Sequence, residues 1–103
     1  MTQLEQEFHE LMVSIYNRAK SEAGYNATIF KKMLGQFGGL ETAKQLLNKP
    51  QVSIGFTALL ERKRLDLTVE AQLLANEKFW DLFTHKQIQT AKDWLRKHDY
   101  HQS

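Results

Sequence analysis

The sequence predicts an all-α protein: a compact, irregular bundle of about six short-to-medium helices in a single domain over residues 1–103. Three observations lead to this class. Apolar residues recur at steps of three and four, the spacing of a helix with one buried face. No segment shows the sustained alternation of apolar and polar residues that marks a half-buried strand. Glycine, proline and helix-capping residues interrupt the helical pattern at short intervals, so long parallel rods are not expected.

The first half of the chain predicts three helices. Gly24 offers a left-handed C-terminal cap for the first, and Asn26 is expected to cap the start of the second. The second helix ends at Gly38-Gly39, and a short third helix then runs as far as the region of Pro50, which forbids a smooth continuation. The apolar stripe of the first helix comprises Leu4, Phe8, Leu11, Met12, Ile15, Tyr16, Ala19 and Ala23.

The second half predicts two short helices and an apolar connection. Ser53 is expected to cap the fourth helix, and Asp66 or Thr68 the fifth. The segment 77–83 contains four large apolar residues. Because this connection is so apolar, we expect part of it to form a helical turn that packs against the core, and not a loose loop.

The last helix has the clearest start. Thr84 and Gln87 have the spacing of a capping box, in which each side chain accepts from the other residue's backbone amide. Phe83 and Ile88 stand where a hydrophobic staple would bring them together across this start.

Composition excludes several classes of protein. The chain has no cysteine, which rules out disulfides, cysteine zinc sites and cysteine nucleophiles and fits a reducing cytoplasm. The N-terminus is acidic and is not expected to be a signal peptide, and no apolar run is long enough to cross a bilayer. We therefore expect a cytoplasmic protein without a membrane partner. The formal charge of +2 is too weak for a strongly basic nucleic-acid surface.

One corner of the chain collects charge and has two interpretations. The charged residues are Glu61, Arg62, Lys63, Arg64 and Asp66. They could form a polar site or a phosphate contact. They could also be structural: basic residues favour a helix C-terminus, Asp66 or Thr68 caps the next helix, and Glu70 sits in its first turn at the positive helix end. We favour the structural interpretation, because capping and dipole effects account for every charge.

No catalytic, cofactor or metal site is predicted. His98 and His101 have the spacing of two helical metal ligands, but the sequence places no further ligand beside them, whereas structural zinc sites use four and catalytic sites three. The serines have no visible base partner. The leading expectation is therefore a protein that is not an enzyme, with an enzyme whose site does not show in one sequence as the lowest alternative.

The aromatic content suggests protein interaction. Trp80 and Tyr100 are the aromatic residues expected to be partly exposed, and exposed aromatics favour interfaces. With Arg62–Arg64 they form the candidate interaction surface of an accessory module that binds another protein or a second copy of itself. The alternative is weak nucleic-acid binding linked to regulation or defence. However, the predicted fifth helix carries no basic residue over 69–76, so it would read a groove poorly.

Five fragments in order resemble a small bacterial family of helical domains of unknown function. They are Tyr25-Asn26-Ala27-Thr28, Gly38-Gly39-Leu40-Glu41-Thr42-Ala43-Lys44, Gly55-Phe56-Thr57, Arg64-Leu65-Asp66-Leu67-Thr68-Val69-Glu70-Ala71 and Leu82-Phe83-Thr84. The resemblance covers about residues 14–100. It implies a bacterial, cytoplasmic domain that stands alone or extends a larger protein at its C-terminus. It implies an accessory or interaction role, and it supplies no activity and no catalytic residues.

Overall fold

The computed structural model of the chain describes residues 2–100 and confirms the all-α class. These residues contain no β-strand. The elements are α1 (Gln3–Ala23), α2 (Thr28–Leu47), α3 (Ile54–Glu61), η1 (Leu65–Leu67), α4 (Val69–Ala75), η2 (Glu77–Leu82) and α5 (His85–Lys97), where η marks a 3-10 helix.

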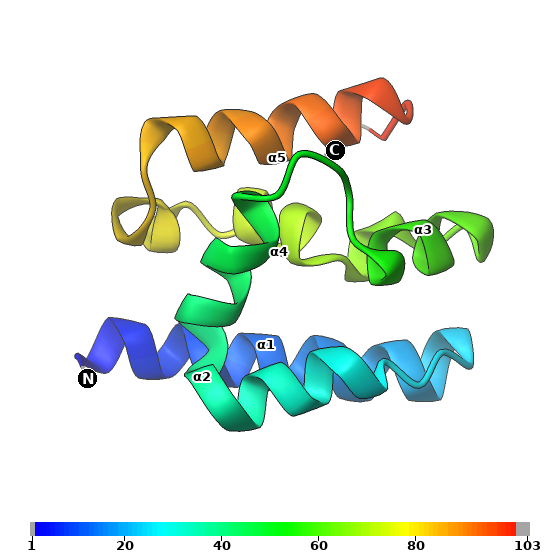
Figure 1. Ribbon diagram of the computed structural model, residues 1–103, viewed down its shortest axis with the longest axis horizontal. Helices are drawn as coiled ribbons and strands as arrows, with labels where there is room; N and C mark the ends of the chain where they lie inside the picture. The colour runs from blue at the N-terminus through cyan, green and yellow to red at the C-terminus, as the bar shows by residue number, and fades with distance from the viewer. Residues whose placement is uncertain (1, 101–103) are drawn as a thin grey trace.

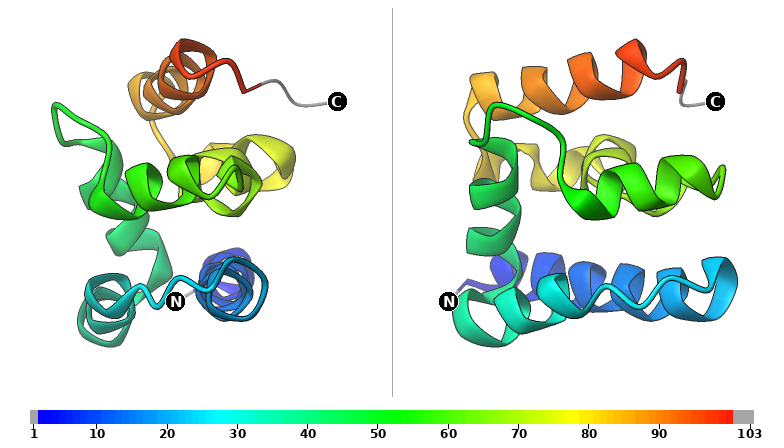
Figure 2. Two further views of the ribbon diagram at one scale, coloured as in Figure 1. Left: turned by 90° about the vertical axis from the view of Figure 1, so that its right-hand side faces the viewer. Right: turned by 45° about the vertical axis from the view of Figure 1, so that its right-hand side comes forward.

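The helices are arranged in three layers (Figures 1 and 2). α1 and the first part of α2 lie side by side and form the lower layer in Figure 1. The short helices α3 and α4 and the two 3-10 helices form the middle layer, and α5 lies across the top. The second part of α2 rises from the lower layer and leads into the connection 48–53, which returns the chain to the middle layer.

A sharp bend divides α2 into two helical segments. Gly38 has φ 79° and ψ 169°, a conformation that glycine adopts readily. At the bend, the Gly39 amide donates a hydrogen bond to His9 Nδ1 on α1, with 2.8 Å between the atoms. A β-carbon at Gly39 would lie 2.6 Å from the His9 α-carbon, so only glycine permits this approach of α2 to α1. The predicted break at Gly38-Gly39 is confirmed, and the α-helices of the described chain form six segments.

The predicted helix starts are mostly confirmed. The side chains of Ser53, Thr68 and Thr84 each accept a hydrogen bond from an amide in the first turn of α3, α4 and α5. Thr84 and Gln87 form the predicted capping box. Between Asp66 and Thr68, the cap of α4 is Thr68.

Of the two caps predicted at the helix junction 24–27, one is confirmed and one is wrong. Gly24 ends α1 in the left-handed conformation at φ 66°, as expected. The prediction that Asn26 caps α2 is wrong, because Ala27 occupies the capping position and supplies no side-chain bond. The Asn26 side chain instead accepts a hydrogen bond from the Tyr16 hydroxyl, at 2.9 Å. A contact between residues ten positions apart replaces the local cap.

The main core lies between α1, α2, α4, η2 and the start of α5. Phe8 is fully buried at its centre and makes edge-to-face contacts with Phe79 and Phe83, with ring centroids 5.2 and 5.3 Å apart. The predicted staple residues Phe83 and Ile88 both belong to this cluster. Two smaller clusters, around Phe56 and around Leu59, pack α3 against η1 and its neighbours.

Candidate functional site

The charged corner ties the end of α3 to the end of α1. Arg62 donates from Nε to the Ala23 carbonyl at 3.1 Å, and its guanidinium lies 5.0 Å from the centre of the Tyr25 ring. Arg64 donates to the carboxylates of Glu22 at 2.7 Å and Asp66 at 3.0 Å. Hydrogen bonds from Arg64 lower the pKa of Asp66. These contacts agree with the structural interpretation of the corner.

The predicted surface residues have different packing environments. Arg62 and Arg64 meet at the end of α1, and Lys63 is an exposed turn residue with φ 59°. Trp80 is half-buried in the main core, where its indole donates to the Leu73 carbonyl at 2.8 Å. Tyr100 is half-buried against the Phe56 cluster instead, and burial raises the pKa of its hydroxyl, assisted by the negative charge of Asp66.

The histidine pair gives no metal site that can be described. His98 Nδ1 lies 2.8 Å from the Trp94 carbonyl, and its ring packs against Phe56. His101 lies outside the described residues. Within residues 2–100, no three histidine or acidic side chains come together in a way that could hold a metal ion.

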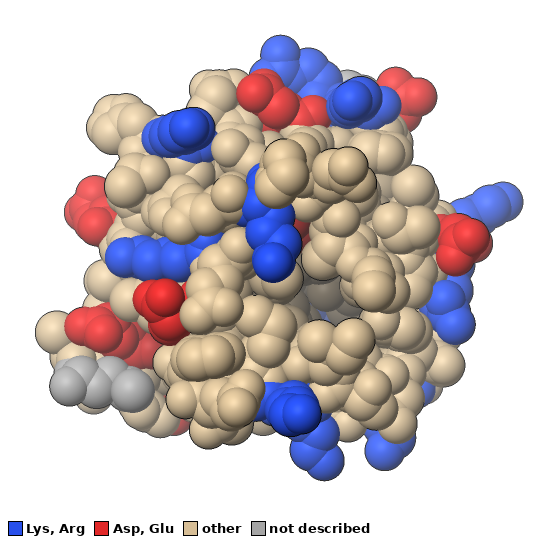
Figure 3. Space-filling view, viewed as in Figure 1, with Lys and Arg blue, Asp and Glu red and all other residues tan. Residues whose placement is uncertain are grey.

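A cavity of about 530 Å³ opens between the lower and middle layers. α1, α2, the connection 48–53, α3 and the start of α4 all contribute to its walls, which are mostly apolar. Figure 3 shows the hollow near the centre of this face; a basic side chain lies beside it, and most of the other charged side chains lie toward the rim of the face. The principal apolar side chains of the wall are Ile15, Phe30, Met33, Val52, Phe56 and Leu59.

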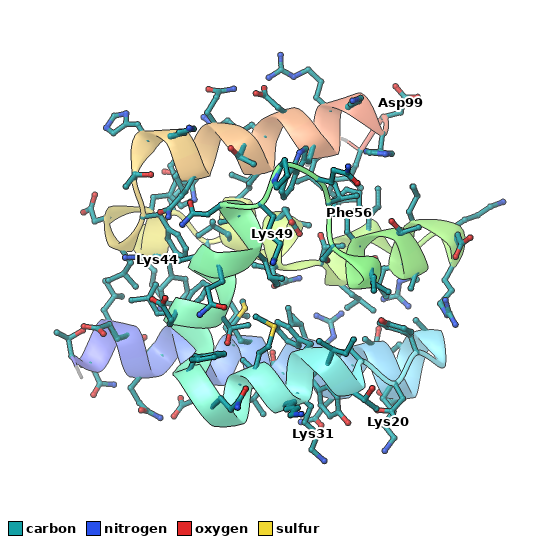
Figure 4. The ribbon with its side chains drawn as sticks, viewed as in Figure 1. Lys20, Lys31, Lys44, Lys49, Phe56 and Asp99 are labelled. Carbon is teal, nitrogen blue, oxygen red and sulfur yellow. The ribbon has the colours of Figure 1, made fainter. Side chains whose placement is uncertain are left out.

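The mouth of the cavity is apolar with one cation beside it. Ile29 and Ile54 both line the cavity and are 63% and 73% exposed. Lys49 comes from the connection after α2; its side chain lies over the middle of this face in Figure 4, at the edge of the hollow seen in Figure 3. Lys49 is exposed and forms no ion pair within residues 2–100.

A buried acidic residue, Glu70, forms part of the cavity wall. Glu70, the second residue of α4, is only 2% exposed. Its Oε2 atom has no hydrogen-bond partner among the described residues. Burial raises the pKa of Glu70 to about 7, and a hydrogen bond from its own backbone amide offsets only part of that rise. The carboxyl group is therefore divided between its neutral and charged forms near neutral pH.

Three hydroxyl groups of the wall already have hydrogen-bond partners. The Tyr16 hydroxyl donates to Asn26, and the Ser53 hydroxyl accepts from the Phe56 amide at 3.0 Å. The Thr68 hydroxyl both donates to the Leu65 carbonyl and accepts from the Ala71 amide. Glu70 thus differs from these neighbours in presenting a buried polar atom that the described chain leaves unsatisfied.

The sequence analysis missed the burial of Glu70. It placed this residue in the first turn at the positive end of a helix, and the structure buries its side chain there. One signal was available: α4 reads VEAQLLA, and four of its residues are buried. A short helix with apolar residues on most sides is a core element, and any acid within it is buried unless it lies on a free face.

Comparisons of the chain with models of known protein families, with curated proteins and with solved structures gave no match. The family resemblance therefore stays a prediction. Across the part of the chain that is described, the helices are too short or too polar to span a bilayer.

Proposed function

We propose that this domain is a non-enzymatic binding module that takes a small, largely apolar molecule in the cavity between its lower and middle layers. The observation that carries the proposal is the cavity itself. Its volume of about 530 Å³ lies in the range typical of small-molecule sites, and its walls combine apolar and aromatic side chains with few polar groups. A bound apolar molecule would also cover part of Ile29 and Ile54 at the mouth.

The chemistry of the wall supports binding more than catalysis. Glu70 is a buried acid, but Ser53 and Thr68, the nearby hydroxyl groups, are engaged as helix caps. A covalent mechanism needs a nucleophile held beside a base, and the wall offers no such pair. A bacterial, cytoplasmic setting is part of the same proposal; the lack of cysteine and the family resemblance support it.

The binding proposal is tested with a neutral dye. N-phenyl-1-naphthylamine becomes fluorescent when it leaves water for an apolar site, and the domain should bind it with saturation at one molecule per chain. Gly55 lines the cavity, and a β-carbon there would meet nothing closer than 3.7 Å. Gly55→Leu should therefore fold, fill part of the cavity and weaken dye binding at least tenfold.

Gly35 supplies the matched control. It is an exposed α2 glycine with nothing within 4 Å of an added β-carbon, and it does not line the cavity. Gly35→Leu should leave dye binding unchanged. Equal binding by Gly55→Leu and the parent, or no saturable binding by the parent, would contradict the proposal.

A protein partner is the second candidate. The exposure of Ile29 and Ile54 favours it, because a partner or second copy that covers them would remove apolar surface from water. Sedimentation of the parent and of Ile54→Gln tests the second copy: association that weakens in the variant supports it.

Weak nucleic-acid binding has less support, since Arg62 and Arg64 make internal contacts and α4 is largely buried.

A further inference from the structure

We propose that the cavity selects a cationic amphiphile: a molecule with an apolar body that fills the cavity and a protonated amine that pairs with the Glu70 carboxylate. This inference rests on the proposed function and names the chemical class of its ligand. The Glu70 side chain is the feature that sets this class, because it is the buried polar group of the wall that still lacks a partner.

The Oε2 atom of Glu70 needs a hydrogen-bond donor from outside the chain. A carboxylate accepts up to about four hydrogen bonds, yet Oε2 of Glu70 receives none from the described residues. A buried polar atom without a partner is costly, and such atoms are rare in folded proteins. An ammonium group provides three donors and a positive charge, so one ligand atom could satisfy both the hydrogen bond and the charge.

The charges around Glu70 favour a cation over an anion. α4 itself carries no other titratable residue, and on the adjoining η1 the Asp66 charge is already paired with Arg64. From the other walls of the cavity, the titratable groups are Lys49, Tyr16 and Tyr25. Lys49 is exposed to water at the mouth, and the raised pKa of Glu70 has burial, with no neighbouring charge, as its cause. The Glu70 carboxylate therefore has no counter-ion within residues 2–100.

The packed neighbours η2 and α5 supply no counter-ion either. On η2, Glu77 and Asp81 are exposed acids, and the exposed Lys78 pairs with Glu7.

The charged side chains of α5 lie on the solvent side of the helix, where all are exposed. They are Lys86, Lys92, Asp93, Arg96 and Lys97. The exposed His85 stands at the start of α5, and His98 after its end is held against Phe56. A cation in the cavity would therefore meet one unneutralised carboxylate.

The test displaces the neutral dye with three compounds of equal chain length: octylamine, 1-octanol and octanoate. At pH 8.5, octylamine should bind at least tenfold more tightly than 1-octanol, since only the amine gains the charge pair. Because Glu70 has a pKa of about 7 and an alkylamine stays protonated to about pH 10, octylamine affinity should rise roughly 30-fold from pH 5.5 to 8.5. Hexylamine has two methylenes fewer than octylamine, and its affinity should be lower by about fourfold for each methylene removed.

Two glutamine variants separate the carboxylate from other causes. Glu70→Gln keeps the size of the side chain and removes its charge; octylamine should then bind no better than 1-octanol and lose its pH dependence. Retained 1-octanol binding by this variant shows that the cavity is still formed. Glu61→Gln, at an exposed position that does not line the cavity, should behave like the parent.

Each contrary outcome has a distinct meaning. Equal affinity for octylamine and 1-octanol in the parent would overturn the cationic ligand and leave an apolar binding site. Preferential binding of octanoate, lost in Lys49→Gln, would overturn it in favour of an anion held at the mouth. Failure of the dye and of all three compounds to bind would remove the proposed function, and the amine proposal with it.

Discussion

Replacing Glu70 by glutamine should change how the stability of the domain depends on pH. In the folded state the pKa of Glu70 is about 7, against an ordinary value of 4.5. The folded protein therefore holds a proton that the unfolded chain has released between these two pH values. Stability from this group is present at low pH and is lost as pH rises from about 4.5 through 7.

The size of the loss follows from the pKa shift. A difference of about 2.5 pKa units corresponds to about 3 kcal/mol, of which roughly 2.5 kcal/mol falls between pH 5 and 8.5. Glu70→Gln has no proton to lose. The free energy of unfolding of the variant minus that of the parent should therefore increase by about 2–3 kcal/mol across this interval.

The measurement is a series of guanidinium denaturation curves from pH 5 to 8.5 for the parent, Glu70→Gln and Glu61→Gln. Taking the difference between variant and parent cancels the titration of every other group that the two share. The ion-paired acids affect the free energy of unfolding at lower pH, because hydrogen bonds lower their pKa. Those from Arg18 and Arg64 hold the pKa of Glu22 at about 2. Glu61→Gln should give a flat difference, because Glu61 is exposed.

A flat difference for Glu70→Gln as well would show that the carboxyl group is solvated or already paired. That result would refute the buried, unpartnered carboxyl group on which the candidate site depends. Titration of the Glu70 carboxyl carbon by NMR gives the pKa directly. A midpoint near 4.5 would lead to the same conclusion.

The remaining predictions concern the backbone, the caps and nucleic acid. Gly39→Ala should destabilise the fold by about 1–3 kcal/mol, because its β-carbon would strike α1, whereas Gly35→Ala should stabilise it by about 0.5–1 kcal/mol; equal midpoints in denaturation would contradict this. Thr84→Ala should cost about 1 kcal/mol through its lost cap, and an unchanged midpoint with unchanged slope would argue against that cap. Thr68→Ala should cost about 1–2 kcal/mol, whereas Asp66→Asn should cost less, since Asp66 does not cap α4; the reverse order of melting temperatures would disprove this assignment. Random duplex DNA should bind no tighter than about 10 μM near physiological salt, and submicromolar, salt-sensitive binding in a filter assay would revive the nucleic-acid alternative.

Local chemistry explains why most of the fold was predictable. The caps at Ser53 and Thr84 each join atoms only three residues apart, so the sequence shows both partners together. The bend at Gly38 likewise depends on the freedom of a single residue. Asn26 was mispredicted because Tyr16, ten positions away, engages its side chain, and local spacing does not reveal such a partner.

The candidate site depends on long-range packing and could not be predicted in the same way. The cavity wall brings together Ile15 and Glu70, which lie on different helices and in different layers. Local rules gave Glu70 a role that agrees with its place in the first turn of α4. They did not reveal that this turn faces inward, because this follows from the packing of α4 against α5, η1 and η2 and from its place at the cavity.

The unsatisfied carboxyl group also links ligand binding to stability. At pH 8.5 the buried charge lowers stability by about 3 kcal/mol, a large share of the 5–15 kcal/mol that a domain usually has. A glutamine at position 70 would avoid the buried charge. The presence of a glutamate there therefore points to a partner that the chain does not contain. A cation that pairs with Glu70 would bind only the folded state and should raise the melting temperature more at pH 8.5 than at pH 5.5. With octylamine as the ligand, the increase should vanish in Glu70→Gln; an equal increase at both pH values would mean that the alkyl chain alone provides the binding.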